Sequence, residues 1–160
     1  MSQSKQLVFL DSDILIAVYD NSDLLRTINH ISNLDRFQIV TSITVLGETF
    51  FKAMDKENTE GIILTTLANI RGWKTDIILP DASVSKLCYE MNIDREDTRM
   101  MSQVTDKVHL GYAISQECKY FLTHDRGLIQ YRIPEKLHEA KFFKPDTLTP
   151  NDFHDRHLRR

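Results

Sequence analysis

The sequence predicts an α/β fold, a three-layer α/β/α sandwich around a central parallel sheet of four to five strands. The first observation is the uninterrupted apolar run at residues 7–10, which is typical of a strand buried on both faces of a parallel sheet. The second is the alternation of short apolar runs with segments of helical periodicity, which favours right-handed crossovers between parallel strands. The third is a length of 160 residues with 41% hydrophobic and 27% charged residues, enough for one domain with a substantial core.

Each strand is predicted from a short apolar run bounded by polar residues. The first covers residues 7–10 and the second residues 37–40, ending at Thr41-Ser42. A third is expected at 75–79, closed by Pro80, a fourth at 120–123 and a fifth at 141–144. The pattern alone does not give the order of the strands in the sheet.

Helices are predicted where apolar residues recur at intervals of three and four. Ser12 or Asp13 is expected to cap a helix over 14–19, and Ser42 or Thr44 a helix that contains 45–51. Further helical segments are expected at 24–34, 60–71, 81–91 and 106–117. The folded domain should span 5–153, with the basic segment 154–160 expected to fray as a C-terminal tail.

The composition gives few signs of a special class of protein. No apolar stretch is long enough to span a bilayer, and the polar start lacks a signal-peptide core, so a cytoplasmic location without membrane association is expected. The formal net charge of −3 neither indicates nor excludes a nucleic-acid partner. Cys88 and Cys118 lack metal-ligand spacing and are expected to be buried thiols.

Four acidic residues each lie beside a predicted apolar element: Asp11, Glu48, Asp106 and Asp125. The carboxyl ends of parallel strands share one edge of the sheet, so these side chains could converge there. Two charges about 4 Å apart repel by roughly 4 kcal/mol at an effective dielectric near 20, so convergence favours a divalent cation. Oxygen ligands favour Mg²⁺ or Mn²⁺, which the four acids would bind directly or through water.

Simpler structural roles exist for the same residues. Asp11 and Asp106 could serve as helix N-caps, and Asp125 as an ordinary turn residue. The neighbouring polar residues are expected to support the ligands from behind rather than to bind the ion; they are Ser12, Asp13, His109 and His124.

These residues resemble the motifs of the PIN-domain family, in particular the VapC-type toxin ribonucleases. FLDSDILI resembles the opening block with Asp11 as its first acid, and TSITVLGETF resembles the second block, which supplies Glu48. TDKVHLGYAISQECKYFLTHDRGL is similar to the third and fourth blocks, with Asp106 and Asp125, and LTPNDF to the closing motif. Thr123 matches the position whose hydroxyl orients an acid or a water molecule.

The resemblance implies a metal-dependent endoribonuclease domain over 5–153 that uses Mg²⁺ or Mn²⁺ to cleave RNA, leaving 5′-phosphate and 3′-hydroxyl ends. It also implies a partner antitoxin and a homodimer. Lys52, Lys107 and Arg126 are the basic residues expected to contact the RNA backbone. Two positions depart from the family pattern: Asp13 stands where Asn is commoner, and Gly111 where Ala is usual.

Two other functions fit parts of the pattern. A PIN-like module could bind RNA or a protein without cutting it. Asp11-Ser12-Asp13 also fits the D-x-D start of haloacid-dehalogenase-like phosphatases, although the segment THDRGL offers only one acid where those enzymes use a pair.

Overall fold

Five parallel strands form a single sheet in the computed structural model, which describes residues 4–93 and 104–159. The strand order is β3-β2-β1-β4-β5, and every neighbouring pair is parallel. The strands are β1 (Gln6–Leu10), β2 (Phe37–Ser42), β3 (Asp76–Ile78), β4 (Tyr120–Leu122) and β5 (Asp146–Leu148). The predicted α/β class with a central parallel sheet is therefore confirmed.

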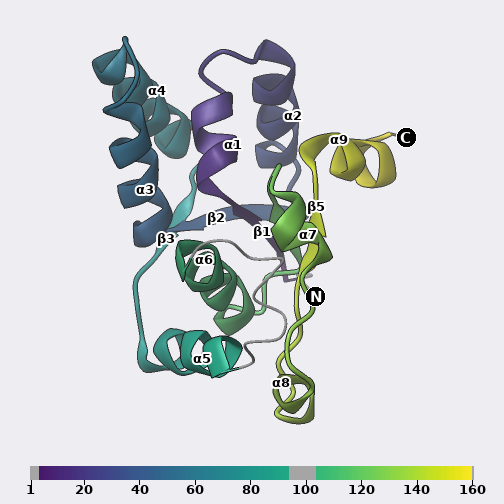
Figure 1. Ribbon diagram of the computed structural model, residues 1–160. Coiled ribbons are helices and arrows are strands. Elements are labelled where there is room, and N and C mark those ends of the chain that lie inside the picture. The colour runs from purple at the N-terminus through teal and green to yellow at the C-terminus, as the bar shows by residue number, and fades with distance from the viewer. Residues whose placement is uncertain (1–3, 94–103, 160) are drawn as a thin grey trace.

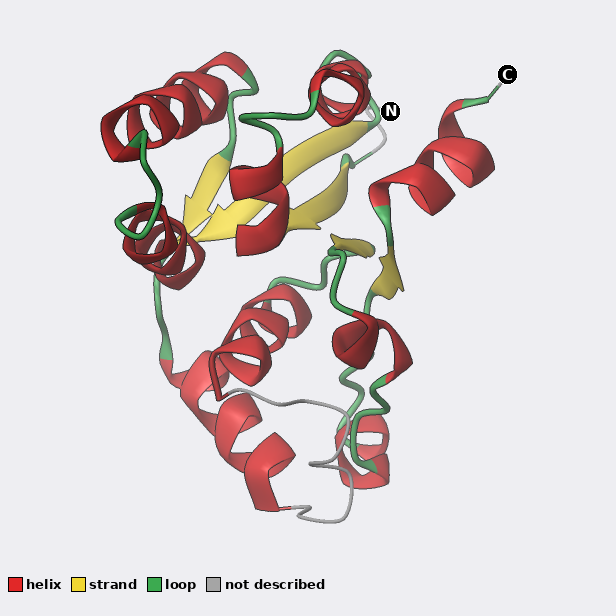
Figure 2. Ribbon diagram, turned by 45° about the horizontal axis from the view of Figure 1, so that its top comes forward, coloured by secondary structure: helices red, strands yellow, loops and turns green. Residues whose placement is uncertain are grey.

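Helices cover both faces of the sheet (Figure 1). The helices on one face are α1 (Ser12–Ala17), α2 (Ser22–Ser32), α3 (Ile43–Ala53) and α4 (Thr59–Gly72). The opposite face carries α5 (Ala82–Ile93) and α6 (Val104–Ser115), as Figure 2 also shows. Two short helices, α7 (Arg126–Gln130) and α8 (Glu135–Glu139), connect β4 to β5, and α9 (Pro150–Phe153) follows β5. Within the described ranges, no helix combines the length and apolar character needed to cross a membrane.

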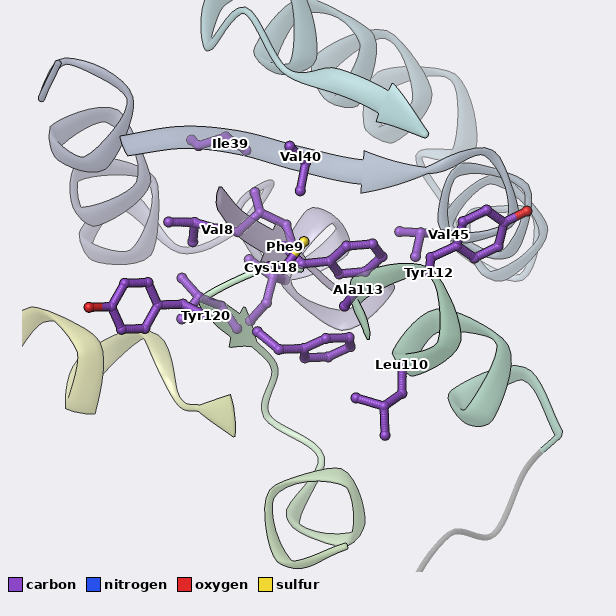
Figure 3. Close-up of a cluster of buried hydrophobic side chains, with 14 of the residues drawn as sticks. Val8, Phe9, Ile39, Val40, Val45, Leu110, Tyr112, Ala113, Cys118 and Tyr120 are labelled. Atoms are coloured by element: carbon purple, nitrogen blue, oxygen red, sulfur yellow. The ribbon is translucent and has the colours of Figure 1, made fainter. Parts of the chain in front are cut away.

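The central strand β1 organises the core. Val8, Phe9 and Leu10 are fully buried, because helices cover the sheet on both sides (Figure 3). The ring of Phe9 stacks on that of Phe121 in β4, with ring centroids 4.9 Å apart. The chain builds β2 and β3 on one side of β1, then places β4 and β5 on the other side. The carboxyl ends of β1 and β4 therefore lie where the strand order reverses, the usual place for a site in an open α/β sheet.

Gly111 allows α6 to approach α5 closely. A Cβ atom at this position would lie 2.9 Å from the Cys88 sulfur, closer than packed atoms tolerate. The departure from Ala at this position therefore has a packing reason. Cys118 is buried and Cys88 is half-buried, and both are free thiols.

Three predictions about the elements were wrong in detail. The fifth strand is Asp146–Leu148 rather than 141–144, whose Phe143 is 65% exposed; the paired phenylalanines there imitate a strand. The cap of α1 is Asp11, whose carboxylate accepts a hydrogen bond from Ser12 N, and not Ser12 or Asp13. Helix α6 is described from Val104 onward, so Asp106 lies inside the helix rather than at its first residue. The prediction that Ser42 caps α3 is confirmed.

The C-terminal residues His154–Leu158 form a π-helical turn rather than a frayed end. Leu158 is buried, and the ring of His157 packs on Tyr120 and Phe153 at centroid distances of 4.8 and 5.0 Å. Arg36 donates a hydrogen bond to the carbonyl of His157 over 2.6 Å. The sequence did not predict this packing, because Leu158 is the single apolar residue in an otherwise polar and charged segment. Arg160 lies outside the described residues, and a domain boundary at residue 153 stays a prediction.

Lys144 fastens the end of α7 to the segment before β5. Its ammonium group donates to the carbonyls of Leu128, Ile129 and Tyr131 over 2.7, 3.0 and 2.8 Å. Because the last carbonyls of a helix lack partners within the helix, a cation at this end satisfies them and favours the helix dipole.

We expect Lys144→Met to lower the free energy of unfolding by about 1–3 kcal/mol, since partly buried carbonyls lose their donor. Urea denaturation followed by circular dichroism measures the change. Lys5→Met, which replaces an exposed lysine, is the matched control and should leave the midpoint unchanged. Equal stability of both variants would contradict a capping role for Lys144.

Candidate metal centre

The candidate site lies where β1 and β4 end side by side. Asp11 follows β1 directly and Thr123 follows β4. The backbone N–H of Asp11 donates to the carbonyl of Leu122 over 3.1 Å, which fixes the two strand ends to each other. Both side chains are buried, with Asp11 4% and Thr123 0% exposed.

Both carboxylate oxygens of Asp11 have partners. Its Oδ1 accepts from Ser12 N over 2.8 Å and lies 2.9 Å from Nδ1 of His109, while its Oδ2 accepts from the hydroxyl of Thr123 over 2.9 Å. A carboxylate only accepts hydrogen bonds, so the contact to His109 places a proton on Nδ1. Asp11 thereby orients the imidazole and directs Nε2 to the other side of the ring.

His109 Nε2 faces Glu48 Oε2 at 3.4 Å, but the two atoms are not aligned for a hydrogen bond. Among the described residues, neither atom has another hydrogen-bond partner, and both are buried. A buried polar atom without a partner is costly, so this geometry calls for a proton or a cation between the two atoms. Asp11, Glu48 and His109 each offer a ligand atom within 4.8 Å of the others, as a metal site requires.

Helix α3 positions Glu48. The hydroxyl of Ser42 caps the helix by accepting from Val45 N over 3.2 Å, which brings Glu48 over the carboxyl end of β1 about one turn later. Glu48 Oε1 forms an ion pair with Lys52 Nζ at 2.8 Å, and Lys52 also donates to the Ser12 hydroxyl over 3.2 Å. Burial by itself would lower the pKa of Lys52, but the bond to Glu48 and the nearby carboxylate charges outweigh it and raise the pKa.

The Thr123 hydroxyl links three acidic residues. It lies 2.9 Å from Asp11 Oδ2 and 3.2 Å from Asp13 Oδ2, and it accepts from Asp125 N over 3.0 Å. One hydroxyl proton cannot serve both carboxylates at once. Burial, followed by the charge of Asp11, raises the pKa of Asp13 to about 7, against the hydrogen bond from His124 N. A proton held on Asp13 near neutral pH relieves the repulsion between the two acids.

Asp106 and Asp125 lie at the edge of this group. Asp106 is 9% exposed on α6. Burial, then the charges of Asp125 and Asp11, raise its pKa to about 6, although His109 acts against the shift. Asp125 caps α7 through its Oδ1, which accepts from Gly127 N over 2.6 Å and Leu128 N over 3.3 Å. Their carboxylates act on the site through charge and lie outside the three ligand atoms within 4.8 Å of one another.

The remaining residues singled out in the sequence lie in differing surroundings. Lys107 is 5% exposed, so burial argues against the prediction that it contacts an RNA backbone. Arg126 is exposed at the start of α7, and Lys52 is directed inward to Glu48. His124 is half-exposed, and burial lowers its pKa.

The sequence predicted that His109 supports the metal ligands from behind, whereas in the structure it lies between Asp11 and Glu48. The signal that could have found it is the spacing of Asp106 and His109, which places both on one side of α6.

Comparison of the whole structure with solved structures finds VapC toxins across nearly the full length. The VapBC2 complex of Rickettsia felis bound to a promoter DNA fragment matches with a TM-score of 0.65 and 13% identity, covering 90% of this chain and 98% of that one. VapBC-1 from nontypeable Haemophilus influenzae matches with a TM-score of 0.65 and 14% identity, covering 91% and 99%. VapC20 of Mycobacterium tuberculosis, a toxin that cleaves the sarcin-ricin loop, matches with a TM-score of 0.55 and 13% identity, covering 85% and 96%.

The chain therefore has the PIN-like α/β fold of the VapC toxins. No family profile matches its sequence, and no curated protein matches it. At identities of 13–14%, these structures establish the fold alone.

We expect Asp106→Asn to stabilise the metal-free protein at pH 7 by about 1–3 kcal/mol and to have little effect at pH 4. The pKa of Asp106 is higher in the folded protein than the ordinary value of 3.8, so the wild type loses stability as pH rises through about 6. Asn carries no charge and escapes this loss.

Urea denaturation in chelator across this pH range measures the difference between the two proteins. Asp20→Asn, which replaces an exposed acid in the turn before α2, is the control for a general charge effect. A stabilisation that does not depend on pH would contradict the burial of Asp106 among like charges.

Proposed function

We propose that the protein is an endoribonuclease that depends on Mg²⁺ or Mn²⁺. The observation that carries the proposal is the cluster of Asp11, Glu48 and His109. In it, His109 Nε2 and Glu48 Oε2 are buried and face each other without a hydrogen-bond partner among the described residues. A cation there would satisfy both atoms and offset the carboxylate charges.

The donor set fits such an ion. Glu48 Oε2 and His109 Nε2 would hold it together with Asp11, and Asp106 and Asp125 would act directly or through water. Carboxylate oxygens suit both ions, while the imidazole nitrogen favours the transition metal, so Mn²⁺ is the better fit. When bound, the metal would supply a Lewis acid that lowers the pKa of water and stabilises charge on the phosphate during hydrolysis.

The residues of the chain itself prepare this chemistry. Asp11 fixes the tautomer of His109, and Thr123 holds Asp11 in place. Asp13, with its pKa near 7, can hold a proton beside the site. The ammonium of Lys52 and the exposed guanidinium of Arg126 supply positive charge that would attract a polyanionic backbone.

RNA as the substrate is supported by the fold. VapC20, which shares that fold, cleaves the sarcin-ricin loop. Structures of this fold have also been determined as VapBC and FitAcB complexes, so we further propose an antitoxin partner, a homodimer and a cytoplasmic location for this chain.

The two other candidate functions have less support. A phosphatase of the haloacid-dehalogenase type would need a pair of acids after a late strand, and the segment THDRGL after β4 offers only one. A module that only binds RNA would not need the unpartnered, buried Nε2 and Oε2 atoms.

We expect the purified protein to cleave single-stranded RNA in Mn²⁺ or Mg²⁺ and to lose this activity in chelator. Asp11→Asn should lower the rate at least about 100-fold, since the amide cannot accept from both His109 and Thr123 while neutralising the ion. Gel analysis with mapping of the product ends measures the activity. Asp152→Asn serves as a matched Asp-to-Asn control on the surface.

Cleavage that persists in Asp11→Asn, or that is insensitive to chelator, would contradict the proposal. RNA binding without cleavage in wild type and variant alike would favour the binding module.

A further inference from the structure

A hollow lies beside the candidate metal centre, and none of its lining residues belongs to the three possible metal ligands. Its volume is about 410 Å³, within the range of small-molecule sites. The residues that line it are Asp13, Ile16, Ala17, Lys52, Asp55 and Lys56. We call this hollow the α1–α3 slot.

The slot is continuous with the metal centre. Asp13 and Lys52 line it, and the same two side chains contact Thr123 and Glu48 in the candidate centre. Lys52 also donates to Ser12 at the start of α1, so one lysine spans the boundary between the slot and the acids. Helices α1 and α3 lie side by side at this point (Figure 1).

The outer wall of the slot is preformed, because hydrogen bonds within the protein hold it in place. The loop after α3, which carries Asp55 and Lys56, is closed by the hydroxyl of Thr59. Its oxygen lies 3.0 and 2.9 Å from the carbonyls of Ala53 and Lys56, so one proton is shared between the two acceptors. Asn58 ties the loop to the turn that follows α1 by donating to the hydroxyl of Tyr19, and it also caps α4. A preformed slot loses little entropy when it binds.

The lining is complementary to a nucleotide. Ile16 and Ala17 present apolar surface to a flat ring, while Asp13 and Asp55 can accept hydrogen bonds from its polar edge. Lys52 and Lys56 supply positive charge for the adjoining phosphates. A nucleobase turned out of its stack next to the scissile phosphate combines all three properties.

We infer that the α1–α3 slot binds the unpaired base of a nucleotide next to the bond that is cut. This inference rests on the proposed ribonuclease function and adds to it a positioning site distinct from the metal ligands. Because a paired base cannot leave its helix without cost, such a slot would favour RNA that is single-stranded at that nucleotide.

The test is a coupling measurement between enzyme and substrate. Oligonucleotides that span a mapped cleavage site carry one abasic residue, moved along the strand, and kcat/KM is measured for each. We expect one position next to the cut at which loss of the base lowers kcat/KM about tenfold in the wild type. The readout is kcat/KM for the intact oligonucleotide divided by kcat/KM for the oligonucleotide that lacks the base at that position. In Ala17→Leu, which fills the slot, this ratio should fall to about one.

Glu57→Ala is the matched control, because Glu57 is exposed in the same loop and does not line the slot. It should retain the tenfold ratio. If Ala17→Leu does not fold, Ile16→Ala gives the same readout by removing part of the apolar wall, with an expected reduction of the ratio.

The outcomes separate the two proposals. Cleavage with no position sensitive to loss of a base, or with a ratio that the slot variants leave unchanged, would overturn the slot assignment alone. The slot would then belong to another occupant, such as a side chain of a partner protein. Absence of cleavage by the wild type in Mn²⁺ would overturn the ribonuclease function and the slot together.

Discussion

The candidate site depends on one physical constraint, the burial of acidic groups around an imidazole at the point where the strand order reverses. Two unit charges about 4 Å apart repel by roughly 4 kcal/mol at an effective dielectric of 20, a large fraction of the stability of a typical domain. Asp11 meets this cost by accepting three hydrogen bonds. The ion pair with Lys52 offsets the negative charge at one oxygen of Glu48, and the other oxygen faces His109. A cation bound between Glu48 and His109 would remove the remaining cost.

The scaffold is built to keep these groups in place. β1 is buried on both faces, and the hydrogen bond between Asp11 N and Leu122 joins its end to that of β4. Three helix starts lie at the same edge, capped by Asp11, Ser42 and Asp125. Two of the candidate site residues therefore also serve as helix caps. The cap alternative for Asp11 is confirmed, whereas Asp125 caps α7 instead of lying in an ordinary turn.

Much of the fold could be predicted because local patterns determine it. The apolar run at 7–10 and the alternation of elements were sufficient for the class, and both strands that bear the site, β1 and β4, were located. The strand order depends on long-range pairing that no local pattern encodes. The fifth strand was misplaced because Phe142 and Phe143 imitate a strand while the true β5 is short and begins with an aspartate.

The site was predictable in composition but not in geometry. Asp11 could be chosen because it follows an apolar strand, and Thr123 because it matches a position of the PIN-domain motif. The structure joins the two side chains directly. The central position of His109 was missed. Its spacing from Asp106 places both residues on one side of α6, but only the packing of α6 brings that side to Asp11 and Glu48. The α1–α3 slot also escaped sequence reasoning, since Ile16 and Lys56 come from segments that only the packing of α1 on α3 brings together.

The most direct measurement of the central claim is an anomalous-difference map from crystals soaked in Mn²⁺, collected for the wild type and for Glu48→Gln. Our account predicts a peak between Asp11, Glu48 and His109 that is lost or strongly reduced in the variant. A map without density at that position in the wild type, or with an undiminished peak in Glu48→Gln, would contradict it.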